Sequence, residues 1–93
     1  MKTIQTPTRY LELTGVSEKQ INYGSSCRAE WLRSVNDLAR EISGGTEKES
    51  AMLMPMLQSI VDAAMADESA KAWIERESPM TLIQVAIKER GLA

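Results

Sequence analysis

The sequence offers one thiol and thirteen carboxylates with which it could do chemistry, and it contains no histidine. Without an imidazole there is no general base near neutral pH, no Ser-His or Cys-His pair and no common zinc site. Cys27 is the only cysteine, and it falls among apolar residues at helical spacing. A thiol in such a position usually packs as a small hydrophobic group. We therefore expect no catalytic residue, and we expect Cys27 to belong to the core.

The carboxylates include three close sets, which are Glu47 with Glu49, Asp67 with Glu68, and Glu75 with Glu77. Such sets can bind Mg²⁺ or divide the roles of acid and base. The first two sets fall in predicted first turns of helices, where negative charge is favourable to the helix dipole. The third set points to two different faces of a helix. The sequence also has no Asp-x-Asp loop, no Glu-x-x-His pair and no Gly-rich phosphate loop. These patterns predict neither a metal site nor a cofactor.

Composition predicts one domain over residues 1–93, because this length supports a single small core. Hydrophobic residues make up 43% of the chain and charged ones 26%, and the net charge is −2. An acidic balance argues against general affinity for nucleic acid or an anionic membrane. The segment Met1–Arg9 lacks the apolar run of a signal peptide, and Ala51–Leu57 is too short to span a bilayer. We therefore expect a cytoplasmic protein that does not bind membranes.

The elements that must position these residues are all predicted to be helices. Thr6 followed by Pro7 is typical of a helix start, which predicts a short first helix that runs to Thr14. Ser17 and Gln20 have the spacing of a capping box and open a long helix. We also expect Val16 and Ile21 to form a hydrophobic staple, and Ile42 or Ser43 to end this helix before Gly44-Gly45.

Three further helices follow in the prediction. Thr46 and Glu49 form a second capping box, and Pro55 should kink or break the helix that they open near Met54. Asp67 offers a cap for a shorter helix with Trp73. The last helix has two alternative caps, Ser78-Pro79 or Thr81 with Gln84, and it ends at Arg90-Gly91. No segment alternates long enough to predict a strand. The expected fold is an all-α bundle of four to five helices around one long central helix.

Winding the long helix at 3.6 residues per turn separates two faces. The apolar stripe contains Gly24, Cys27, Trp31, Val35, Leu38 and Ile42. Trp31 and Trp73 have aliphatic neighbours at helical spacing, which predicts core roles for both rings. Arg28 lies at the edge of the stripe, where it could stack on Trp31 or pair with an acid of another helix.

The opposite, polar face of the long helix is the predicted partner-binding surface. Its members are Asn22, Ser26, Arg33, Asn36 and Arg40. Arginine and asparagine form directional hydrogen bonds, and arginine is enriched among interface hot spots. The alternative is a solvated face in which Arg33 pairs with Asp37. Residues 1–43 carry a net charge of +1 and residues 44–93 one of −3, so the acidic region Asp62–Glu77 is the second candidate surface.

The segment Tyr10–Ile21 resembles the helix-turn-helix of DNA-binding regulators, with Gly15, Val16 and Ile21 at that family's turn and packing positions. Leu11 departs from the small residue usual in the first helix, and Gly24 from the bulky residue usual in the second. Six basic and five acidic residues over residues 1–43 supply little attraction to phosphate. Direct DNA binding by such a regulator is the alternative function.

A second resemblance covers about a third of the chain. Gly15–Ile21, then Arg28 and Trp31, and later Ala70–Glu75 resemble segments of small helical proteins from phages and other mobile elements. The shared motifs are helix caps and core tryptophans, and Gly24-Ser-Ser26 departs from the regular helix expected there. Small phage proteins without catalytic residues often occupy a host protein or ribonucleoprotein complex, as anti-CRISPR proteins do. The resemblance implies the same helical scaffold. By analogy with anti-CRISPR proteins, which are similar in size and character, we expect a non-catalytic inhibitor in the host cytoplasm, in its sharpest form an anti-CRISPR against a type I effector.

Overall fold

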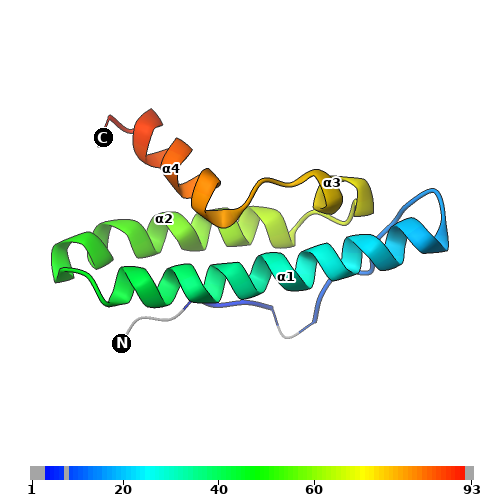
Figure 1. Cartoon of the computed structure of the whole chain (residues 1–93), viewed down its shortest axis with the longest axis horizontal. Helices are drawn as coiled ribbons and strands as arrows, with labels where there is room; N and C mark the ends of the chain where they lie inside the picture. The colour runs from blue at the N-terminus through cyan, green and yellow to red at the C-terminus, as the bar shows by residue number, and fades with distance from the viewer. Residues whose placement is uncertain (1–3, 8, 92–93) are drawn as a thin grey trace.

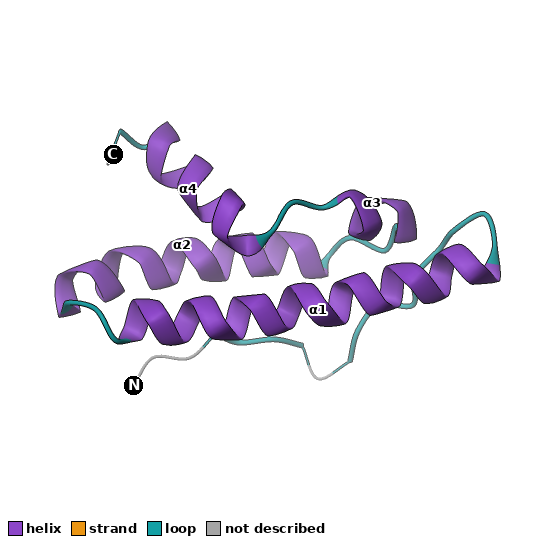
Figure 2. Cartoon of the chain, viewed as in Figure 1, coloured by secondary structure: helices purple, strands orange, loops and turns teal. Residues whose placement is uncertain are grey.

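The computed structural model describes residues 4–7 and 9–91, and this part of the chain is 71% helical. The described residues form no strand, and a single isolated bridge pairs Thr14 with Ser69. The four helices are α1 (Glu18–Ser43), α2 (Glu47–Met65), α3 (Ala70–Glu75) and α4 (Pro79–Glu89). The all-α prediction is confirmed (Figure 2).

Helix α1 begins and ends where the sequence predicts. The Ser17 hydroxyl accepts a hydrogen bond from the Gln20 N–H at 3.1 Å. The Gln20 side chain in turn accepts one from the Val16 N–H at 2.8 Å, one residue before the capping residue. The predicted staple is wrong, because Val16 is 92% exposed. At the other end Gly44 caps the helix and donates its N–H to the carbonyl of Arg40.

Helix α2 continues through Pro55 without the predicted break. Its start is confirmed, since the Thr46 hydroxyl accepts a hydrogen bond from the Glu49 N–H at 3.1 Å. Proline removes the donor that would bond to the Ala51 carbonyl. Both Ala51 and Pro55 lie on the exposed side of α2, so water can satisfy that carbonyl. The helix therefore retains Pro55 without burying an unpaired group.

The N-terminal capping residues of α3 and α4 define where these two shorter helices begin. Ser69 caps α3, with its hydroxyl accepting from the Ala72 N–H, so the prediction that Asp67 is the cap is wrong. Asp67 instead orients the capping residue, since its carboxylate accepts a hydrogen bond from the Ser69 N–H at 2.9 Å. Of the two alternatives for α4, Ser78 followed by Pro79 is the one that forms.

The predicted first helix does not form in its described part, since residues 4–7 and 9–14 are not helical; Thr8 of this prediction lies outside the described residues. Long-range contacts hold this segment and outweigh its local helix signals. Leu13 is buried, and Thr14 donates its N–H to the Glu68 carbonyl at 2.7 Å while accepting from the Ala70 N–H at 2.8 Å. Tertiary pairing of this kind routinely overrides weak helix propensity.

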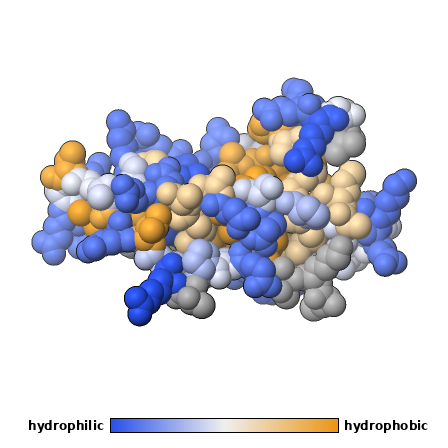
Figure 3. Space-filling model, turned by 180° about the vertical axis from the view of Figure 1, so that it is seen from behind, coloured by the Kyte–Doolittle hydropathy of each residue, from blue (hydrophilic) through white to orange (hydrophobic). Residues whose placement is uncertain are grey.

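Helices α1 and α2 run antiparallel and side by side, and α1 also contacts α3 and α4 (Figure 1). In the view of Figure 1 the N-terminal segment passes below α1, and its end reaches the start of α3, where Thr14 pairs with Ser69. The core between these elements is built mainly from one face each of α1 and α2, with Leu13, Trp73 and Ile83 added from outside them. Seen from behind, hydrophobic residues cross the middle of the molecule and hydrophilic ones interrupt them (Figure 3).

Gly24 marks the closest approach of α3 to α1. A Cβ atom at this position would lie 2.9 Å from both the Cα and the Cβ of Ala70, and 3.0 Å from its carbonyl oxygen. Those atoms belong to backbone or to a residue that is fully buried, so they cannot move aside without moving α3. The irregular Gly24-Ser-Ser26 stretch is therefore explained by packing, because only glycine lets α3 sit this close.

We expect Gly24→Ala to lower the free energy of unfolding by about 1 kcal/mol, because overpacking costs of about 1–3 kcal/mol exceed the gain of about 1 kcal/mol in helix propensity. Chemical denaturation followed by far-UV circular dichroism measures this change. Ser25→Ala, at the exposed neighbouring position, is the control and should not destabilise the protein. A Gly24→Ala variant that is more stable than the parent would contradict the close contact.

Candidate functional site

The five residues of the predicted binding surface all lie exposed on α1, on the side that is turned away from the core. We call this set the α1 outer face; its residues are Asn22, Ser26, Arg33, Asn36 and Arg40. A regular helix of 26 residues holds them in register from one turn to the next. Glu18, at the start of the helix, winds onto this face, while Glu30, Asp37 and Glu41 follow a neighbouring edge.

The two arginines of the α1 outer face differ in their contacts. Arg40 forms an ion pair with Asp37 at 3.8 Å, in which both side chains are more than 70% exposed. The Arg33–Asp37 pair considered from the sequence does not form, because Asp37 pairs with Arg40 instead, and a solvated face stays the alternative interpretation of these residues. Within the described part of the chain, Arg33 has neither an ion-pair partner nor a side-chain hydrogen bond. The Arg33 guanidinium is thus available in full to a partner.

The predicted core residues of α1 are buried with one exception. Val35 and Leu38 are buried, and Trp31 and Trp73 are 6% and 2% exposed. The two indole rings meet edge to face, with their centroids 5.4 Å apart. Cys27 is only half-buried, since it lies at the side of α1 where α3 and its connection to α4 leave a hollow. The prediction that Cys27 belongs to the core therefore holds only in part.

The N–H group of each indole also donates a hydrogen bond to a backbone carbonyl in a connection between two helices. Trp31 donates to the Glu77 carbonyl at 2.9 Å, and Trp73 donates to the Asp67 carbonyl at 3.0 Å. The Arg76 guanidinium lies 4.4 Å from the centre of the Trp73 ring and forms an ion pair with Asp67 at 2.8 Å. These contacts fix the connection of residues 76–78 against α1. Sequence reasoning missed them, although Trp73 and Arg76 have the spacing of neighbours on a helix.

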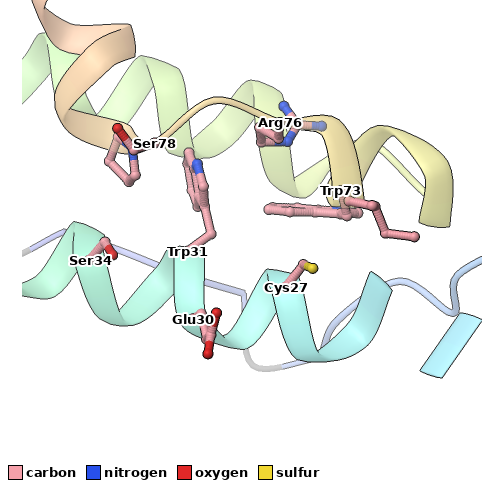
Figure 4. A pocket seen from close by; sticks show the side chains of 9 residues that line it. Cys27, Glu30, Trp31, Ser34, Trp73, Arg76 and Ser78 are labelled. Atoms are coloured by element: carbon pink, nitrogen blue, oxygen red, sulfur yellow. The ribbon is translucent and has the colours of Figure 1, made fainter. Parts of the chain in front are cut away.

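A groove runs along α1 beside this connection, and we call it the α1 groove. Its first part is a hollow of about 240 Å³ whose walls include Cys27, Trp31, Ile74 and Ser78 (Figure 4). The second part adjoins it, because Ser34, Ser78 and Pro79 line both. The Cys27 sulfur and the Trp31 ring point from α1 toward the α3–α4 side (Figure 4). The groove therefore combines an apolar floor with polar edges.

Arg28 has a structural role, as expected, but with other partners than those predicted. It is buried, and it donates to the Leu11 carbonyl at 2.7 Å instead of pairing with an acid. Its guanidinium lies 5.0 Å from the centre of the Tyr10 ring, so it stacks on Tyr10 and not on Trp31. Arg28 thereby holds the N-terminal segment against α1.

The three acidic sets do not assemble into one site. Among residues 4–7 and 9–91, no group of three or more Asp, Glu or Cys side chains is arranged to hold a metal ion. Within the described residues, no helix is both long enough and apolar enough to cross a membrane. The second candidate surface, Asp62–Glu77, is divided among the end of α2, helix α3 and the connections around it.

The helix-turn-helix geometry is not formed by the segment that resembles it. Residues 9–17 are not helical, so the helix that should precede the Gly15 turn is missing. Gly15 instead lies where a Cβ atom would meet the Gln20 side chain at 2.7 Å, at the start of α1. The long helix α1 therefore lacks the supporting first helix of that motif.

Comparison with protein-family models, with curated proteins and with solved structures found no match.

Proposed function

We propose that this protein is a non-catalytic inhibitor that binds a host protein or ribonucleoprotein complex through the α1 outer face. The observation that carries the proposal is Arg33, a fully available guanidinium at the middle of a rigid polar helix face. Arginines of this kind act as interface anchors because they donate several hydrogen bonds in a fixed geometry. The absence of histidine from the sequence supports a role that needs no catalysis.

The arrangement of charge on α1 supports a partner surface that is acidic or rich in hydrogen-bond acceptors. Arg33 and Arg40 lie on the α1 outer face with two asparagines between and beside them, while Glu30, Asp37 and Glu41 lie along the adjoining edge. A partner that docks here contacts hydrogen-bond donors at the centre of the face, with acidic residues along one edge and at the N-terminal end, where Glu18 lies. Complementary charge of this type sets orientation and specificity.

The sharpest form of the proposal is an anti-CRISPR protein that binds a type I effector in the host cytoplasm and prevents target-DNA binding. It rests on an analogy in size and character with anti-CRISPR proteins, beside the resemblance of Gly15–Ile21, Arg28, Trp31 and Ala70–Glu75 to small phage proteins. In this proposal the chain is a single domain, and α1 is the central helix of its bundle. A reconstituted type I effector should co-elute with the protein in size-exclusion chromatography.

A gel shift with the isolated protein at physiological salt separates this proposal from the alternative function. Specific DNA binding without the effector would support a DNA-binding regulator and contradict the inhibitor. Co-elution with the effector, without a shift of free DNA, is the result that the inhibitor predicts. Failure to co-elute with the effector would contradict the anti-CRISPR form.

We expect Arg33→Glu to weaken partner binding by about 10- to 100-fold, because it replaces an anchor by a charge of the wrong sign. Folding should be unchanged, since Arg33 is exposed and forms no ion pair or side-chain hydrogen bond within the described chain that the substitution removes. The dissociation constant is measured by biolayer interferometry with the immobilised effector, and circular dichroism verifies the fold.

Lys48→Glu is the matched control, with the same change of charge at an exposed position on α2, outside both candidate surfaces. It should bind like the parent protein. If Arg33→Glu and Lys48→Glu lower affinity to the same extent, net charge and not the α1 outer face controls binding. If neither variant changes affinity, the interface lies on another surface.

A further inference from the structure

The floor of the α1 groove is apolar over a length that suits a short peptide. Trp31 and Trp73 lie beneath it, and Ile74 and Met80 leave apolar surface exposed along it. On α1 its lining residues extend from Cys27 to Glu41. At 1.5 Å per residue this stretch is about 21 Å long, which matches about six residues of extended chain.

The edges of the groove carry uncompensated negative charge. Glu30, Asp37 and Glu41 line it from α1. Asp37 is paired with Arg40, but neither Glu30 nor Glu41 has an ion-pair partner within the described chain. Two basic residues lie at the groove, and both are paired. Arg76 pairs with Asp67 at 2.8 Å, and Arg40, which lines an adjoining hollow with Asp37 and Glu41, pairs with Asp37 at 3.8 Å. The free charge in the groove is therefore acidic.

We propose that the α1 groove binds a short basic segment of a partner protein, which places an apolar side chain over Trp31 and lysine or arginine side chains against Glu30 and Glu41. Charge complementarity selects this occupant, since an acidic segment would meet two unpaired carboxylates. The apolar floor adds burial that a purely ionic contact lacks. The groove adjoins the α1 outer face, since Asp37 lines the groove and pairs with Arg40 of that face. The proposed contacts with Trp31, Glu30 and Glu41 involve no residue of the α1 outer face, so the inference does not depend on the function proposed above.

The probe is the capped peptide Lys-Lys-Leu-Ala-Leu-Lys-Arg, titrated into the full-length protein at low salt. Both tryptophans of the chain, Trp31 and Trp73, line the groove, so their fluorescence reports occupancy directly. Modification of the single thiol, Cys27, by a maleimide should slow in proportion to the bound fraction. We expect Glu30→Gln combined with Glu41→Gln to raise the dissociation constant about tenfold.

Glu12→Gln combined with Glu89→Gln is the matched control, because it removes the same charge at exposed positions that do not line the groove. This control should bind the peptide like the parent. A second peptide, in which glutamate replaces every lysine and arginine, should not bind. Equal binding of both peptides, equal affinity of both double variants, no binding of the basic peptide, or an unchanged rate of Cys27 modification would each overturn the proposal.

Discussion

Trp31→Ala is expected to lower the free energy of unfolding by about 3–5 kcal/mol, which is the usual cost of removing a large buried ring and leaving a cavity. Trp31 is buried between α1 and the α3–α4 connection, and its ring packs edge to face on Trp73. The substitution also leaves the Glu77 carbonyl without its donor. Urea denaturation followed by far-UV circular dichroism measures the loss.

Trp31→Phe is the control for this prediction. It keeps an aromatic ring in the core but removes the N–H that bonds to Glu77, so its loss should lie well below that of Trp31→Ala. An unchanged midpoint for Trp31→Ala would show that Trp31 is not a core residue. Equal losses for the two variants would show that the hydrogen bond, and not the ring, carries the stability.

Arg28→Ala is expected to cost about 2–3 kcal/mol, because it removes a charge-assisted hydrogen bond to the Leu11 carbonyl together with a cation–π contact with Tyr10. The substitution should destabilise the N-terminal segment locally and also lower the free energy of unfolding of the whole protein. Since Arg28 holds the N-terminal segment, amide hydrogen exchange should accelerate at Thr14 and Ala70, whose N–H groups bond across the Thr14–Ser69 bridge.

Arg28→Met retains the apolar stem and removes the charge, so it separates packing from hydrogen bonding. We expect exchange at Thr14 and Ala70 to accelerate in this variant too, with a smaller global loss. Parent-like exchange in both variants would contradict the assignment of Arg28 as the residue that holds the segment.

The start of a helix could be predicted from the sequence wherever a hydrogen bond between residues close in the chain determines it. Ser17, Thr46 and Ser78 cap helices as their spacing indicates, because a capping hydroxyl bonds to an N–H only three residues away. The two faces of α1 follow from its period in the same way. Exposure of the candidate partner-binding residues was therefore predictable, and the buried stripe differs only at Cys27.

Features set by distant contacts could not be predicted. The Thr6-Pro7 signal indicates a helix, but the pairing of Thr14 with Glu68 and Ala70 holds the segment extended. The α1 groove exists because Trp31 bonds to the Glu77 carbonyl, 46 residues along the chain. No local pattern encodes such a contact. The sequence also could not show which arginine pairs with Asp37, because spacing alone allows an ion pair with either Arg33 or Arg40.

If the protein inhibits a type I effector through the α1 outer face, as we propose, it should change how much target DNA the effector binds. This amount is measured with the parent protein, Arg33→Glu and Lys48→Glu. We expect the parent and Lys48→Glu to block DNA binding at near-stoichiometric concentration, and Arg33→Glu to leave it intact. Normal DNA binding beside the parent protein, or an equal block by Arg33→Glu, would rule out inhibition through this face.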